Sequence, residues 1–151
     1  MTHINFYVSK DEGLQNRLAI VCRLTNVALK NNLTVHIHTD NESTSKLIDD
    51  KLWIIDKTSF IPHTVVTAEQ HQSDTPENHN KRLESVTISH NFEPMNDCDY
   101  LINISNQRPN FFSRFTKVAE IIDASKEILI AGRERYAFYR DRGYTLKYHQ
   151  L

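Results

Sequence analysis

Alternation of strand-like and helix-like segments is the feature that most restricts the fold of this chain. Ile4–Val8 is a short apolar stretch typical of a buried strand, and residues 14–29 then repeat apolar side chains at helical spacing. The same order recurs in Leu33–His38, a second strand, and in a helix that begins near residue 40 and runs through Leu52. Strands that alternate with helices are typical of a mostly parallel sheet covered by helices. The sequence therefore predicts an α/β fold.

The second half of the chain continues this pattern less regularly. The remaining expected elements are strands at Ser85–Ser89, Tyr100–Ile104, Val118–Ile122 and Tyr144–Tyr148, a short helix at Phe111–Phe115 and a final helix at Lys126–Arg142. The stretch from Trp53 to His63 is apolar but irregular, and residues 69–82 are polar and are expected to form an exposed loop. With no repeat and no long linker, residues 1–151 are expected to form a single domain.

Polar residues at the expected helix starts predict how each helix begins. Ser9 and Glu12 have the spacing of a capping box before the first helix. Asp40 is expected to cap the second helix, and Asp123 or Ser125 is expected to cap the last.

Composition excludes several classes of protein. Apolar residues make up 39% of the chain and the net charge is −1, which argues against disorder. No apolar run approaches the ~20 residues of a membrane helix, and the first residues lack the pattern of a secretory signal, so no membrane partner is expected. The two cysteines, Cys22 and Cys98, form no disulfide framework and indicate a reducing compartment, so we expect a cytoplasmic protein. The three glycines match no phosphate-binding loop, so no nucleotide cofactor is expected.

Two histidines of the second strand and an aspartate after it are the candidate residues for a metal site or for catalysis. His36 and His38 alternate on one strand and share a face, which two zinc-bound imidazoles would require, and Asp40 follows at the carboxyl end of that strand. Further ligands at a recognisable spacing are missing, so no metal is expected. A small enzyme that uses His36, His38 or Asp40 remains an alternative hypothesis.

Basic and aromatic residues gather at the end of the chain. Between Arg133 and His149 there are five basic and two acidic residues, and five of the aromatic side chains lie there too. On a helical wheel from Ile128, Leu129, Arg133, Tyr136 and Arg140 fall on one arc about 60° wide. Two guanidinium groups that bracket a phenol and a leucine suit an anion attached to an apolar group, such as a C-terminal carboxylate that follows an aromatic residue.

The stretch Gly132–Tyr144 strongly resembles the closing helix of the chi subunit of bacterial DNA polymerase III holoenzyme. The opening Phe6-Tyr7, the pair Leu52-Trp53 and the stretch Ser59–His63 agree with that family, and the likeness spans nearly the whole chain. The resemblance implies a Rossmann-like domain that binds no nucleotide. It also implies an accessory subunit that is itself non-catalytic.

Two partners follow from the resemblance. Chi proteins pair with the psi subunit of the clamp loader and bind the acidic, phenylalanine-ended tail of single-stranded DNA-binding protein, so contact with single-stranded DNA is indirect. The family's tail-binding residues correspond to Arg133, Tyr136 and Arg140, the arc found on the wheel, with Leu129 beside them. The candidates for the psi contact are the apolar residues Trp53, Phe60, Ile61 and Pro62.

Two positions depart from the family pattern. Ala137 stands where a lysine occurs in the family, and Leu129 replaces a basic residue one turn before the arc's first arginine. Tail binding is therefore expected either to be weaker or to rely more on Arg135, Arg142 or Lys147. Direct binding of single-stranded DNA by the arginines and tyrosines of this region is a further alternative.

Overall fold

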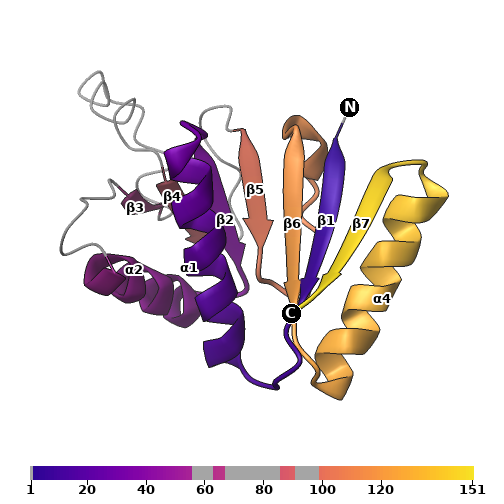
Figure 1. Ribbon diagram of the computed structural model, residues 1–151, viewed down its shortest axis with the longest axis horizontal. Coiled ribbons are helices and arrows are strands. Elements are labelled where there is room, and N and C mark those ends of the chain that lie inside the picture. Colours follow the sequence, from indigo (N-terminus) through magenta and orange to yellow (C-terminus); the bar gives the residue numbers. More distant parts are fainter. Residues whose placement is uncertain (1, 56–62, 67–85, 91–98) are drawn as a thin grey trace.

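The computed structural model describes residues 2–55, 63–66, 86–90 and 99–151. Its described residues form a seven-stranded parallel sheet in the order β3-β4-β2-β5-β6-β1-β7 (Figure 1). The strands are β1 (His3–Val8), β2 (Val35–Thr39), β3 (His63–Val66), β4 (Val86–His90), β5 (Tyr100–Asn103), β6 (Lys117–Ile122) and β7 (Thr145–Gln150). The helices are α1 (Leu14–Lys30), α2 (Glu42–Ile55), the short 3-10 helix η2 (Phe112–Arg114) and α4 (Lys126–Asp141). The α/β prediction is confirmed.

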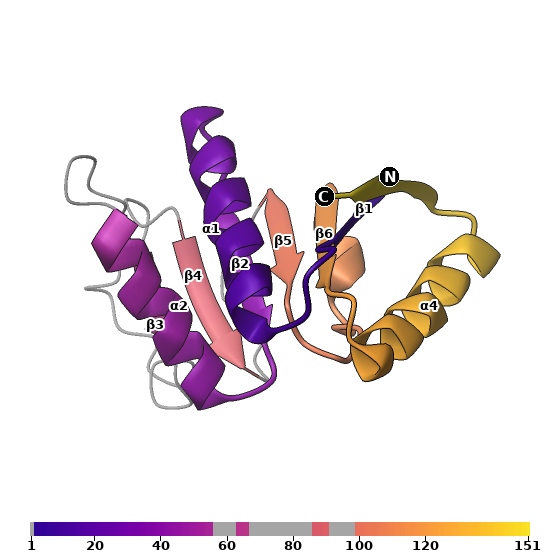
Figure 2. The same ribbon diagram turned by 60° about the horizontal axis from the view of Figure 1, so that its bottom comes forward.

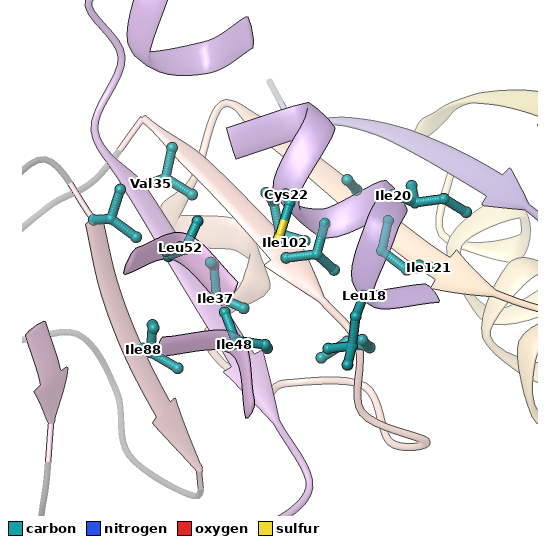
Figure 3. Packing of buried hydrophobic residues seen from close by; sticks show 14 of the residues in the cluster. Leu18, Ile20, Cys22, Val35, Ile37, Ile48, Leu52, Ile88, Ile102 and Ile121 are labelled. Atoms are coloured by element: carbon teal, nitrogen blue, oxygen red, sulfur yellow. The ribbon is translucent and has the colours of Figure 1, made fainter. Parts of the chain in front are cut away.

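One face of the sheet is covered by α1 and α2, which Figures 1 and 2 show over the part formed by β4, β2 and β5. The core between these helices and the sheet is aliphatic. Figure 3 shows Leu18 and Cys22 of α1 and Ile48 and Leu52 of α2 above the branched side chains of the strands. Cys22 is buried in this cluster and belongs to the core.

The opposite face of the sheet packs against α4 and the segment around η2. Side chains alternate along a strand, so Phe6 of β1 and Val118 of β6 point to this second face. The core here is aromatic. The ring of Phe112 lies 5.1 Å from Tyr139 of α4 and 5.2 Å from Tyr144, in edge-to-face arrangements that aromatic pairs prefer.

The first helix does not begin with the predicted capping box. Ser9 accepts a hydrogen bond from the backbone N–H of Asp11 and donates to the same residue's carbonyl oxygen, so it stabilises a turn before the helix. The residue that precedes α1 is Gly13, with a φ of 118° and no side-chain cap. A local turn and a capping box compete for the same serine hydroxyl, and here the turn takes it.

The capping prediction for the second helix is wrong, and the prediction for the last helix is confirmed only in the position of the capping residue. Asn41, and not Asp40, accepts a hydrogen bond at 2.9 Å from the N–H of Thr44 in the first turn of α2. Neither Asp123 nor Ser125 gives α4 a side-chain cap, although Ser125 does occupy the capping position. Asp40 instead binds the backbone of Asn106. Asp123 accepts from the N–H of Ser125 at 2.7 Å through one oxygen and from the N–H of Gly13 at 3.2 Å through the other, so it joins the start of α4 to the residue before α1.

Two differences concern the middle of the chain. The helix α2 continues to Ile55, into the stretch that looked irregular, and β3 adds an edge strand at His63–Val66 that the sequence analysis did not predict. Four residues are too few for a clear alternation of apolar and polar side chains. Within the described ranges, no helix has both the length and the apolar character needed to cross a membrane.

Candidate functional site

The helix α4 carries the candidate site, and its position is fixed near its middle and at its C-terminal end. Near its middle, Gly132 faces Ile122 of β6 so closely that a Cβ atom would lie 3.0 Å from two methyl carbons. At its end, Gly143 adopts a φ of 82° and donates to the carbonyl of Arg140, while the N–H of Tyr144 reaches the carbonyl of Tyr139. This pair of hydrogen bonds is a Schellman motif, which closes the helix.

A buried polar network joins the inner side of α4 to the sheet. Glu120 of β6 is fully buried and accepts hydrogen bonds from Asn103 at 2.7 Å, from Arg135 at 3.1 Å and from the hydroxyl of Tyr139 at 2.6 Å. Burial raises the pKa of Glu120, and its ion pair with Arg135 and its hydrogen bonds oppose that shift. The network thus fixes the rotation of α4 about its own axis.

The arc that the wheel predicted lies on the outer part of α4, and we call Leu129, Arg133, Tyr136 and Arg140 the tail arc. Arg133 and Arg140 are exposed, and Leu129 and Tyr136 are half-buried at the edge of the aromatic core. The ring of Tyr136 rests 5.3 Å from that of Phe6, which holds its place. The tail arc therefore combines two exposed guanidinium groups with apolar side chains that are fixed against the core.

Neither arginine of the tail arc is tied into the fold. Arg140 approaches Asp141 at 3.3 Å, but these side chains are 62% and 70% exposed. An ion pair in water contributes little, because solvent screens it and both side chains lose freedom. Seven residues separate Arg133 from Arg140, so their backbones lie about 10 Å apart along the helix, close to two turns.

The three additional basic residues lie elsewhere. Arg135 is buried in the ion pair with Glu120, which corrects the expectation that it adds to a binding surface. Arg142 lies over the ring of Phe138, at 4.7 Å, on the flank of α4 away from the tail arc. Lys147 is exposed and pairs in register with Asn5, so its side chain leaves the sheet on the α1 face.

The two strand histidines are both buried, and His36 is hydrogen-bonded within the fold. Both ring nitrogens of His36 are hydrogen-bonded, to Thr87 at 2.6 Å and to Ser89 at 3.1 Å. Burial lowers the pKa of His36 to about 3 and that of His38 to about 4, so both rings are neutral at neutral pH. Asp40 accepts a hydrogen bond from the N–H of Asn106 at 3.0 Å and so holds the segment that follows β5.

No metal-binding arrangement appears among the described residues. In that part of the chain no three side chains of histidine, cysteine, aspartate or glutamate lie close enough to hold an ion. The candidates for the psi contact fall elsewhere: the backbone of Trp53 belongs to the last turn of α2, but its side chain and the residues Phe60, Ile61 and Pro62 lie outside the described residues.

Comparison with known families and proteins identifies the family to which this chain belongs. A family model described as DNA polymerase III chi subunit, HolC, matches residues 1–147. The chain belongs to this family. DNA polymerase III subunit chi of Pseudomonas aeruginosa is 30% identical over 151 residues, which cover all of this chain and 98% of that protein. The Haemophilus influenzae subunit is 26% identical over 141 residues, which cover 93% of this chain and 92% of that protein. The chi-family chain is thus an accessory subunit of DNA polymerase III.

Solved structures show what the fold of this chi-family chain is like. It matches the C-terminal domain of the DEAD-box protein Dbp5 with a TM-score of 0.69 at 10% identity, over 99% of this chain and 90% of that one. It matches T4 UvsW with a TM-score of 0.66 at 12% identity, over 99% of this chain but only 41% of that one. At such low identities, the likeness concerns the α/β fold alone.

The sequence analysis missed one basic residue near α4. Arg108 follows β5 in the sequence, and its guanidinium carbon lies 3.6 Å from the ring centre of Phe138 on α4. Thirty residues separate the two positions, and no periodic pattern connects them. The one sequence signal for Arg108 is its place before Pro109, because a proline here indicates a loop, and binding residues are common in loops.

Proposed function

We propose that this chi-family chain links the clamp-loader complex to single-stranded DNA-binding protein and that it catalyses no reaction itself. Its partners in this proposal are the psi subunit and the acidic C-terminal tail of single-stranded DNA-binding protein. The observation that carries the proposal is the tail arc, in which Arg133 and Arg140 flank Tyr136 on an exposed helix. A non-catalytic role agrees with His36, whose two ring nitrogens are hydrogen-bonded within the fold, and with Asp40, whose Oδ1 accepts from the N–H of Asn106.

The chemistry of the tail arc suits such a peptide. One arginine of the arc binds the terminal carboxylate through a charge-assisted pair of hydrogen bonds. Tyr136 and Leu129 border the position of the phenylalanine ring, where the half-buried side chains offer apolar contact. The other arginine then meets the aspartates upstream. The carboxylate contact contributes most, because the apolar neighbours shield it from water.

Replacement of Arg133 tests this assignment. We expect Arg133→Ala to weaken binding of a tail peptide at least tenfold, because removal of one partner of a charge-assisted pair in a partly desolvated site costs about 2–5 kcal/mol. A peptide with an amidated C-terminus should bind the wild-type chain with a similarly reduced affinity, since it lacks the opposite charge of the same pair. Arg23→Ala is the matched control, because Arg23 is an exposed arginine on α1.

The readout is a calorimetric or anisotropy titration with three peptides: the tail, the amidated tail and a tail without its last residue. Equal affinity for all three would contradict a carboxylate-binding arc and would leave a diffuse basic surface. An oligonucleotide that competes with the tail for Arg133 at matched salt would favour direct binding of single-stranded DNA by the same arc.

The psi contact is proposed from family membership, with Trp53, Phe60, Ile61 and Pro62 as its candidate residues. We expect Trp53→Ala to reduce co-purification with the psi subunit while the isolated chain keeps a cooperative unfolding transition. Loss of that transition in the isolated variant would identify Trp53 as a core residue, because emptying a packed aromatic position costs about 3–5 kcal/mol.

A further inference from the structure

A second basic site lies on the flank of α4 opposite to the tail arc. The guanidinium carbon of Arg108 is 3.6 Å from the ring centre of Phe138 and 6.0 Å from that of Phe112, and the guanidinium carbon of Arg142 is 4.7 Å from Phe138. We call Arg108, Phe138 and Arg142 the arginine stack. Nine residues separate Arg142 from Arg133, which places them about 180° apart around the helix.

The two charges of the arginine stack have no carboxylate partner among the described residues. In the same part of the chain, Arg17 pairs with Asp123 at 2.9 Å and Arg135 pairs with Glu120. Arg108 and Arg142 instead share one aromatic ring, which attracts each guanidinium but leaves their mutual repulsion in place. Two cations on one ring, neither neutralised by a carboxylate, raise the local positive potential and so favour the binding of an anion.

The segment that carries Arg108 is held firmly before any ligand binds. Both Asn103 and Ser105 donate to the carbonyl of Gln107, at 3.1 and 2.7 Å. The carbonyl of Asn106 accepts from Arg135 at 3.0 Å, and its N–H binds Asp40. A stacked guanidinium keeps its N–H donors at its rim, where they can reach a ligand. A preorganised pair of donors loses little freedom on binding.

We propose that the arginine stack binds the phosphodiester backbone of a single-stranded nucleic acid. Guanidinium groups match the oxygens of a phosphate in bidentate geometry. Exposed amide side chains next to the stack, those of Asn106, Gln107 and Asn110, add hydrogen-bonding groups suited to sugars and bases. Two arginines are few for a rigid duplex, whereas a flexible strand can bend its phosphates toward a small site.

An acidic peptide fits the arginine stack less well. The aromatic side chain of the stack, Phe138, is already contacted by both guanidinium groups, at 3.6 and 4.7 Å from its ring centre, so its faces are not free for an apolar side chain of a ligand. A peptide partner would thus lack an apolar anchor, which usually supplies most of its binding energy.

Acidic side chains lie between the tail arc and the arginine stack, so a tail peptide bound at the arc would have to cross them to reach the stack. The exposed Glu134 and Asp141 lie on α4 between the two sites, at about 240° and 220° on the wheel, and would repel aspartates of the tail. The two basic sites therefore serve different anions. This proposal goes beyond the tail-binding function and does not depend on it.

The test measures binding of fluorescein-labelled oligothymidylate to the full chain by anisotropy across a series of salt concentrations. We expect Arg108→Gln with Arg142→Gln to lower the affinity at least tenfold at low salt. Each phosphate contact contributes about 0.7 to the slope of log K against log salt for a single strand, so the slope should fall by about 1.4.

Two further variants keep the outcome interpretable. Arg23→Gln with Lys30→Gln removes the same charge from exposed positions on α1 and should leave the slope unchanged within error. Arg108→Lys keeps the charge but not the planar stacked group, so it should weaken binding and retain most of the slope. Melting temperatures show that each variant folds. An equal loss of affinity in the control pair, or no binding by the wild-type chain, would overturn the proposal.

A comparison of ligands identifies the source of the phosphate and separates this site from the tail arc. Oligouridylate is the second probe. Equal affinity for oligothymidylate and oligouridylate means that the site recognises the phosphodiester backbone alone, and a preference for one of them shows whether the site favours DNA or RNA. The tail peptide is the third probe, and its affinity should be unchanged by the double variant at Arg108 and Arg142. If that double variant no longer binds the tail peptide and keeps the oligonucleotides, the stack is an acidic-peptide site and the proposal is wrong.

Discussion

Arg135 of α4 and Glu120 of β6 form a buried ion pair, in which Nε donates to Oε1 at 3.1 Å between side chains that are 6% and 0% exposed. Arg133 lies only two residues away and is exposed. Two residues correspond to about 200° around a helix, so neighbouring arginines of the same motif point to opposite environments. One arginine therefore holds α4 to the sheet while the other remains available for a ligand.

This difference predicts unequal effects of the same substitution on stability. We expect Arg135→Ala to lower the free energy of unfolding by about 3–5 kcal/mol, because it leaves the carboxylate of Glu120 buried without its cation. Arg133→Ala is the matched control and should change it by less than about 0.5 kcal/mol. Urea denaturation of the three proteins measures both values. Similar small changes in the two variants would show that the buried pair does not hold the helix.

The close approach of Gly132 to Ile122 predicts that a single methyl group disturbs the packing of α4. Alanine favours the helix by about 1 kcal/mol over glycine, but overpacking at 3.0 Å costs about 1–3 kcal/mol. We expect Gly132→Ala to be destabilising on balance. Ile122→Val removes one of the two crowded methyl carbons, so the double variant should lose less than the sum of the single variants. Additive losses in thermal denaturation would contradict the steric explanation.

The buried histidines predict how stability depends on pH. Their pKa values are about 3 for His36 and about 4 for His38, below the ordinary value near 6.5 that they regain on unfolding. Between these values the unfolded chain binds more protons, so acid destabilises the fold. Each histidine contributes stability that is full above pH 6.5 and declines as the pH falls toward its folded pKa, by up to about 1.4 kcal/mol per pH unit.

The pH effect is measured by urea denaturation at intervals between pH 6.5 and 4.5. Compared with the wild-type chain, His36→Gln should lessen the decline of stability with acid, because glutamine does not titrate and can still bind Thr87 and Ser89. His3→Gln is the control, since His3 is exposed at the start of β1. The explanation would be wrong if both variants kept the wild-type slope.

Local patterns in the sequence predicted which segments are helices or strands and which residues form the tail arc, because both depend on residues close in the chain. Helical periodicity alone places Arg133, Tyr136 and Arg140 on one side of a helix, and the structure has them there. The cap of the second helix failed for the opposite reason: Asp40 had the right spacing, but it binds the N–H of Asn106, which is distant in the sequence. A short polar side chain next to a helix start has several possible partners, and spacing does not choose among them.

Apart from the short strand β3, the sequence itself determined the succession of strands and helices along the chain, the parallel sheet and the shared arc of Arg133, Tyr136 and Arg140. The reason is that backbone geometry repeats at fixed periods of two and 3.6 residues. The tertiary structure alone decided the roles of the other arginines. Arg135 became an internal ion-pair partner because Glu120 lies beneath it, and Arg108 came to lie on Phe138 through the packing of the segment after β5 against α4. Those contacts join positions fifteen or more residues apart. They depend on how the whole chain packs, because several elements together bury the charged and aromatic side chains.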